Sequence, residues 1–96
     1  MGLFSIFKRN KRENSETARL DFLRQNGRIT DGTIIDSETN EAGEEVVFYI
    51  YNVHGVDFES SEILTAKQRE NPIACAPGAK VGVRFDPKNH GNSMLM

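Results

Sequence analysis

The sequence lacks most of the residues on which secreted domains and metalloenzymes depend. Cys75 is the single cysteine among 96 residues, so no internal disulfide can form and a reducing compartment is favoured. The chain has no C-x-x-C or His-x-x-x-His spacing and no glycine-rich phosphate loop. Nothing beside Cys75 activates its thiol, which argues against a nucleophile paired with His54 or His90, two expected turn residues. We therefore expect no metal, no cofactor and no enzymatic activity.

Long apolar runs are also absent, and this excludes a transmembrane helix of the usual length. A signal peptide is not indicated, because the basic residues follow the first apolar stretch instead of preceding it. With 38% hydrophobic and 27% charged residues, the composition is that of an ordinary globular domain. We expect a cytoplasmic protein with one modest core.

Basic residues are missing from residues 31–62, which contain nine acidic residues, whereas residues 1–12 carry four basic residues and no acid. The net charge of −2 hides this separation. An acidic body repels phosphate backbones, so nucleic acid is a disfavoured partner for the folded part. The basic segment, in contrast, suits an anionic surface.

β-Branched and aromatic residues are abundant, and they are concentrated in the stretch from Val46 to Val53, which predicts a β-strand. A two-residue turn at His54–Gly55 would fold the next strand back and pair Tyr51 with Phe58. This register puts one set of apolar side chains on a common face, which we predict to be the core. Its members are Val47, Tyr49, Tyr51, Val53, Val56 and Phe58.

The opposite face of this hairpin carries Phe48 and Ile50 beside the acids Asp57 and Glu59. Two interpretations fit. In the first, the N-terminal helix of the chain covers the two apolar side chains, as layered domains usually arrange. In the second, Phe48, Ile50 and the neighbouring acids form a docking patch for a protein partner.

The remaining patterns complete a mainly β fold. Residues 15–26 predict one helix that ends at Gly27 and buries Ala18, Phe22 and Leu23. Further strands are expected at residues 28–36, with a bulge at Gly32, at residues 79–85 and at residues 93–96, with a helical turn over residues 65–71. A type I turn is expected at residues 86–89, where Pro87 pre-sets φ and the Asp86 carboxylate can accept a nearby backbone N–H. We predict a small antiparallel β-barrel or curved sheet of four or five strands with one N-terminal helix, forming a single domain over residues 15–96.

Residues 1–14 form a separate tail in this interpretation. On a helical wheel its apolar side chains share one arc and its basic side chains extend the other side, as in an interfacial membrane helix. The candidate membrane-binding residues are Leu3, Phe4, Ile6, Phe7, Lys8, Arg9, Lys11 and Arg12. The alternatives are a disordered tail and a segment folded onto the domain's own surface.

The segment Gly78–Leu95 fits the pattern G-x-x-V-x-V-x-[YF]-D-P-x-N followed by Ser and Leu, and the upstream piece Y-I-Y-N-V-H-G-V-D-F fits a strand–Gly–strand unit. Together these motifs resemble a family of small uncharacterised bacterial β-domains, a domain of unknown function. The resemblance implies a β fold close to a membrane, since family members are often attached to transmembrane helices, and it implies no catalytic residue. His90 departs from the family, in which a proline is usual at this position.

Three functions follow from these patterns. The first is a non-catalytic interaction or accessory module that is peripheral to the inner membrane through residues 3–12. The second is a soluble protein-binding module that uses Phe48 and Ile50. The third is single-stranded nucleic-acid binding on Tyr49 or Tyr51 as stacking platforms. The predicted register turns both tyrosines inward, which ranks this function last.

Overall fold

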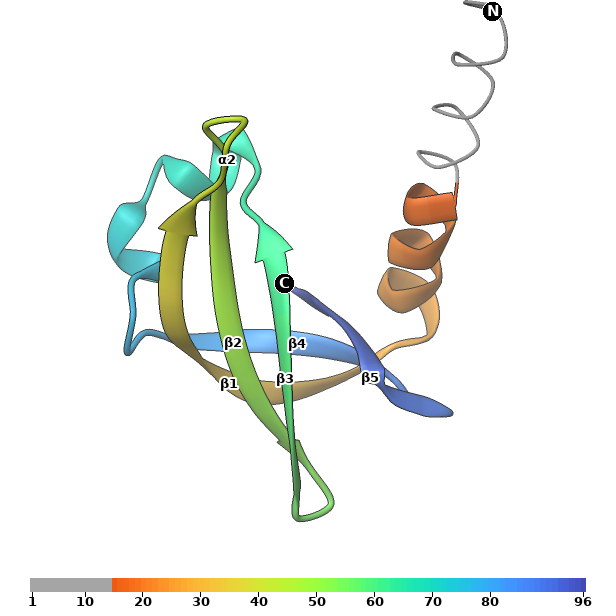
Figure 1. Ribbon diagram of the computed structural model, residues 1–96. Helices are drawn as coiled ribbons and strands as arrows, with labels where there is room; N and C mark the ends of the chain where they lie inside the picture. Colours follow the sequence, from red (N-terminus) through yellow and green to blue (C-terminus); the bar gives the residue numbers. More distant parts are fainter. Residues whose placement is uncertain (1–14) are drawn as a thin grey trace, which may run out of the picture.

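The computed structural model describes residues 15–96, and Figure 1 shows them as a strongly curved sheet with one helix beside it. All neighbouring strands are antiparallel, in the order β3-β2-β1-β4-β5, and the sheet curls into a nearly closed barrel. The strands are Arg28–Thr39 (β1), Glu45–Val53 (β2), Val56–Ile63 (β3), Lys80–Asp86 (β4) and Asn89–Leu95 (β5). The prediction of a small antiparallel barrel is confirmed.

Helical segments lie before β1 and between β3 and β4. The N-terminal helix, α1, is described over residues 15–26, as predicted. The connection from β3 to β4 contains the short helix Ala66–Arg69 (α2) and the 3₁₀ turn Pro72–Cys75 (η1). Thr65 begins α2 with a capping box, in which its hydroxyl accepts from the Gln68 N–H and the Gln68 side chain accepts from the Thr65 N–H.

The central hairpin has the predicted register. Tyr51 pairs with Phe58 and Val53 with Val56, and the Tyr51 and Phe58 rings stack with centroids 5.7 Å apart. The turn residues His54 and Gly55 have φ values of 52° and 85°, as a type I′ turn requires. On the predicted core face, the four β2 residues Val47, Tyr49, Tyr51 and Val53 are buried, whereas Phe58 is half-buried and Val56, beside the turn, is 55% exposed.

The core lies on the concave side of the sheet and draws on β1, β2, β4, β5 and the residue after β3, with the partly buried Phe58 of β3 packed against it. Its buried members are Ile34, Val47, Tyr49, Tyr51, Val53, Leu64, Val83, Phe85 and Leu95. Polar groups inside it are paired: the Tyr51 hydroxyl donates to the His90 carbonyl at 2.6 Å. His90 was expected in a turn but lies in β5, where its ring packs edge-on against Phe85.

Strand β1 is shared between two parts of the barrel, and Gly32 lies where they meet, paired with Tyr51 of β2 and Val81 of β4. The bulge predicted at Gly32 is wrong, because the register shift falls at Ile35. Gly32 has a different role. A Cβ atom there would lie 2.7 Å from Val83 Cγ2, so only glycine lets the core approach the strand this closely.

Strands β3 and β5 are the two edges of the sheet and run in the same direction, as the alternating ladders dictate. No backbone ladder joins them in the described chain, so the barrel has a seam. The Glu62 carboxylate of β3 bridges it by accepting the Leu95 N–H of β5 at 3.1 Å. A side chain thus replaces the missing ladder bond.

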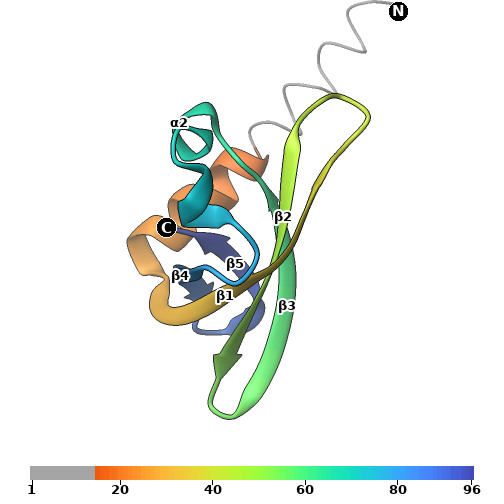
Figure 2. The ribbon, with the colours of Figure 1, turned by 90° about the vertical axis from the view of Figure 1, so that its left-hand side faces the viewer.

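Helix α1 packs on a different part of the sheet from the one expected. It stands beside β5, away from the outer side of β2 (Figures 1 and 2). The cover expected over Phe48 and Ile50 is therefore not provided by α1. Gly27 at its end lies against β4, where an added Cβ would be 3.4 Å from Arg84 Cβ.

The buried face of α1 also differs from the prediction. Leu23 is fully buried, but Phe22 is 43% exposed and Ala18 is exposed, while Leu20 is half-buried. The reason lies in β5. Met94 points away from the core between the inward Ser93 and Leu95, and this outer apolar side chain is buried where α1 approaches.

Candidate functional site

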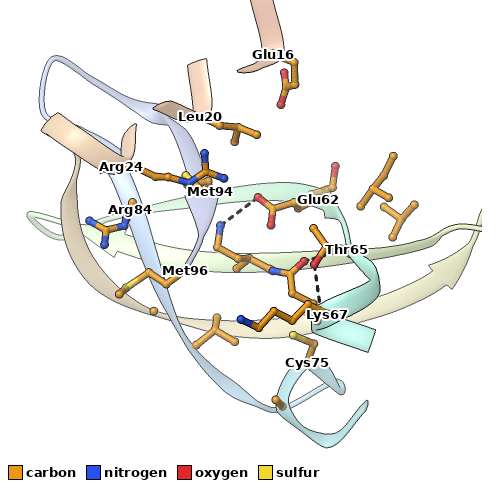
Figure 3. Close-up of a pocket in the computed structure, with 18 of the residues that line it drawn as sticks. Glu16, Leu20, Arg24, Glu62, Thr65, Lys67, Cys75, Arg84, Met94 and Met96 are labelled. Atoms are coloured by element: carbon orange, nitrogen blue, oxygen red, sulfur yellow. Dashed lines mark hydrogen bonds between the residues drawn. The ribbon is translucent and has the colours of Figure 1, made fainter. Parts of the chain in front are cut away.

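A groove with a volume of about 1230 Å³ runs along the seam. α1 and the end of β5 form one side, and α2 with η1 forms the other (Figure 3). Much of its lining is apolar, from Leu20, Val46, Ile63, Val81, Met94 and Met96. Four basic side chains and two acidic ones also line it: Arg19, Arg24, Lys67, Arg84, Glu16 and Glu62. The groove is therefore apolar with a basic excess, in a protein whose net charge is negative.

Glu62 lies at the centre of the seam. Its position on β3 is opposite the buried Val47, which turns the carboxylate toward the barrel interior. Burial raises the pKa of Glu62, although the hydrogen bond from the Leu95 N–H and contacts with Gln68 and Arg19 oppose the shift. The carboxylate is held by the protein and is not free to act on a ligand.

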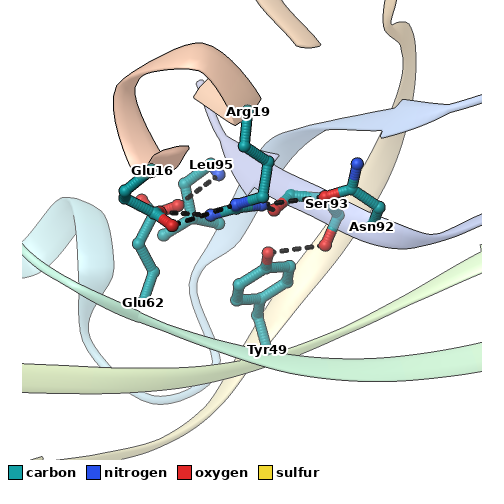
Figure 4. Close-up of polar contacts among 7 residues, drawn as sticks. All are labelled: Glu16, Arg19, Tyr49, Glu62, Asn92, Ser93 and Leu95. Carbon is teal, nitrogen blue, oxygen red and sulfur yellow. Dashed lines mark hydrogen bonds and ion pairs between the residues drawn. The ribbon is translucent and has the colours of Figure 1, made fainter. Parts of the chain in front are cut away.

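Arg19 fastens α1 to β5. Its guanidinium donates to Asn92 Oδ1 at 2.9 Å and to the Ser93 carbonyl at 3.0 Å, and it pairs with Glu16 at 2.6 Å (Figure 4). The hydrogen bond with Glu16 raises the pKa of Arg19 and lowers the pKa of Glu16. Beneath it, the buried Tyr49 hydroxyl lies 2.7 Å from Ser93 Oγ. Arg19 therefore has a structural role.

The other basic side chains of the groove are more available. Arg24 pairs with Asp21 at 3.1 Å on the exposed surface of α1. Arg84 and Lys67 make no ion pair and no side-chain hydrogen bond with any described residue. Arg84 is placed by β4 and Lys67 by the first turn of α2, on opposite sides of the groove (Figure 3). These two cations can receive an anion without giving up an existing partner.

Cys75 also lines the groove, at the end of η1. Partial burial raises the pKa of its thiol, and the negative charges of Glu45 and Glu62 act in the same direction. A thiol that stays protonated is a poor nucleophile. The arrangement assigns Cys75 to packing.

The residues predicted as a protein-docking patch lie together on the outer side of the hairpin. Phe48 and Ile50 are half-buried, and Asp57 and Glu59 are exposed. A hollow of about 610 Å³ adjoins Ile50 and Asp57, and Lys80 lines its other side. The structure thus brings the four predicted residues to one surface, separate from the groove.

The residues predicted to bind a membrane, Leu3 to Arg12, lie outside the described residues. The groove itself was missed by sequence reasoning. One signal was present, because extending the hairpin register past Tyr49 puts Glu62 opposite Val47 on the inward face, where an acid is unusual. Arg84 and Lys67 gave no such signal.

Comparisons with protein-family models, with curated proteins and with solved structures found no match. Among the described residues, no helix is long and apolar enough to cross a membrane.

Proposed function

We propose that the protein is a non-catalytic accessory module of the cytoplasmic membrane surface, which attaches through residues 3–12 and receives an anionic lipid in the seam groove. The observation that carries the proposal is a pair of cations on two sides of an apolar groove, Arg84 and Lys67, which have no partner among the described residues. A lipid with an anionic headgroup matches both features of the groove, because its headgroup can bind the two cations and its acyl chain can pack against the apolar lining.

The groove is large enough for part of such a molecule. Its volume of about 1230 Å³ exceeds the roughly 300–1,000 Å³ that is usual for small-molecule sites. Arg84 offers a planar guanidinium that binds phosphate oxygens in pairs, and Lys67 adds a mobile point charge. Met94 and Met96 provide flexible apolar surface that adapts to a chain of variable shape.

The position of the groove suits a membrane-bound protein. Leu20 and Arg24 of α1 line one side of it, and α1 follows the basic apolar segment directly in the sequence. A segment that enters the interface with its apolar residues brings α1 and the groove to the headgroup layer. Each basic residue near an anionic surface adds about 1 kcal/mol of attraction.

Vesicle sedimentation tests the proposal. We expect the intact chain to pellet with vesicles containing anionic lipid, and a chain without residues 1–14 to pellet several-fold less. Equal pelleting of the two chains would exclude the membrane function. Vesicles of neutral lipid serve as the control for charge.

A second comparison tests the groove. In the intact chain, the double variant Arg84→Glu and Lys67→Glu should bind a monomeric single-chain anionic phospholipid at least tenfold more weakly. Lys80→Glu with Lys88→Glu changes the net charge equally but lies outside the groove lining, so binding should be retained. If both double variants lose binding alike, the effect is one of net charge and the groove is not the site.

A further inference from the structure

We propose that the outer face of strands β1, β2 and β3 is the docking surface for residues 3–12 of the same chain. This outer face consists of the apolar Val46, Phe48 and Ile50 of β2 and the acids Asp36, Glu38, Asp57 and Glu59 beside them. The proposal goes beyond membrane attachment and does not require it. It gives the basic N-terminal segment a second partner within the protein.

The ladders arrange the outer face in rows across three strands. Phe48 lies between Asp36 of β1 and Ser61 of β3. Ile50 lies between Thr33 and Glu59 in the next row. Neighbouring rows place Val46 beside Glu38 and Asn52 beside Asp57. The result is an apolar stripe along β2 with carboxylates on both sides.

These carboxylates have no cationic partner in the described chain. The two ion pairs between described residues both lie within α1. Asp57 accepts a hydrogen bond from the Asn52 amide at 2.9 Å, and Asp36 accepts one from the Ser37 N–H at 2.8 Å. Lys80 is the basic residue beside this face, and its ammonium donates to Thr33 Oγ1 at 3.1 Å. A partner that brings cations to the acids would meet little competition.

Residues 3–12 combine the two chemistries that complement the outer face. The segment has four apolar side chains for the β2 stripe and four basic side chains for the acids, and it contains no acidic residue. Basic residues are absent from residues 31–62, so the outer face has no cation of its own on β1 from Asp31 onward, β2 or β3. Complementary charge of this kind selects a partner and its orientation.

The tether makes the intramolecular contact feasible. Residue 3 lies twelve residues before the start of α1, so an extended chain lets it reach at most about 40 Å from the first turn of the helix. A tethered segment has an effective concentration in the millimolar range, so weak contacts suffice to populate the docked state. Residues 3–12 cannot lie on the outer face and in a membrane interface together, so the two sites compete for one segment.

Paramagnetic relaxation enhancement tests the docking on the full chain. A nitroxide is attached at Ser5→Cys in a Cys75→Ser background, and amide signals are recorded on ¹⁵N-labelled protein. We expect the signals of Phe48, Ile50 and Glu59 to lose intensity several-fold, and those of Lys67 and Arg84 to lose much less. Uniform intensities along β2, or selective loss at Lys67 and Arg84, would overturn the proposal.

Charge swaps supply the specificity control. Replacing Lys8, Arg9, Lys11 and Arg12 by Glu should restore the β2 intensities, and adding Asp36→Lys and Glu59→Lys to that variant should reduce them again. Lys88→Glu is the matched variant that should change nothing. If the charge swap has no effect, the segment is not held by these acids.

Two further measurements distinguish docking within one chain from contact between two copies and from membrane binding. A mixture of ¹⁵N protein without nitroxide and nitroxide protein without ¹⁵N should show no loss, and a loss there would place the segment on a second copy and overturn the intramolecular contact. Failure of vesicle pelleting leaves the enhancement pattern untouched, so the two proposals fail separately.

Discussion

The groove at the seam and the outer face of β1–β3 use the same hairpin in opposite ways. Val46 belongs to the outer face and also reaches the groove lining, yet basic side chains predominate in one region and acidic ones in the other. Charges at the groove are partly organised by α1, through Arg19 with Glu16 and Arg24 with Asp21. No helix of residues 15–96 covers the outer face. The position of α1 therefore decides which apolar surface this helix covers and which it leaves open.

The same comparison bears on nucleic-acid binding. Five-stranded, partly open barrels of the OB type bind oligonucleotides on the face of strands 2 and 3. Here that face carries acids, which repel phosphates. Tyr49 and Tyr51, the proposed stacking platforms, are 0% and 2% exposed and lie in the core. The acidic outer face and the buried tyrosine rings both argue against nucleic-acid binding.

The largest predicted effect follows from removing the contact that holds α1. Leu23→Ala deletes most of a fully buried side chain, and this should weaken the docking of α1 on the sheet by about 2–5 kcal/mol. Because Leu23 lies outside the main core cluster, α1 should detach while the barrel stays folded. Hydrogen exchange checks this: amides of residues 19–26 should lose protection and those of β2 should keep it.

Phe22→Ala is the matched control, since its side chain is 43% exposed and the change should cost well under half as much. The comparison of the two regions also predicts a split in binding. Leu23→Ala should weaken lipid binding at the groove and leave the nitroxide pattern on the outer face unchanged. Equal loss of protection in α1 and β2 would show that the helix and the barrel unfold as one unit.

A smaller effect is expected at the seam itself. Glu62→Ala removes the acceptor of the Leu95 N–H and leaves a partly buried donor unpaired, which costs about 1–3 kcal/mol. Glu62→Gln keeps an acceptor at the same position and should cost much less. Urea denaturation of the two variants and the parent chain measures both free energies of unfolding. Similar losses for Ala and Gln would mean that the charge of Glu62, and not its acceptor, holds the seam.

The pH dependence of Glu62 has a defined sign. Burial raises the pKa of its carboxyl in the folded protein, so the folded state binds the proton more tightly than the unfolded chain. This contribution to stability is complete below the ordinary glutamate pKa and is lost as the pH rises through the raised value. Stability of the parent chain relative to Glu62→Gln should therefore fall over the pH range that begins at the ordinary glutamate pKa and extends above it. A relative stability that rises over this range would contradict the assignment.

The elements that sequence reasoning predicted best are those determined by local chemistry. The His54–Gly55 turn fixes the β2–β3 register because Gly accepts positive φ and His tolerates it. Asp86 and Pro87 likewise define the turn before β5, where the Asp86 carboxylate accepts the Lys88 N–H at 2.8 Å. In both turns, neighbouring residues specify the backbone without help from distant parts of the chain.

The features that were predicted wrongly depend on contacts between distant residues. Gly32 has the sequence appearance of a bulge, but its role is set by Val83, which is 51 positions away. The face of α1 that packs on the sheet depends on Met94 and Ser93 of the last strand. The sequence of α1 itself gives no indication of these contacts. The groove is likewise formed by five separate segments that meet at the seam. Local patterns cannot specify such sites.

The smallest predicted effect concerns the outer face without its partner. Glu59 is exposed and has no ion pair with a described residue, so Glu59→Gln should change the free energy of unfolding by no more than about 0.5 kcal/mol. Thermal unfolding at low and high salt measures this change. The same substitution should nevertheless reduce the enhancement at Phe48 and Ile50, since it removes one of the charges proposed to hold residues 3–12. A surface charge that matters little for stability but measurably for docking is expected of an interaction site, whereas a large loss of stability would assign Glu59 to the fold.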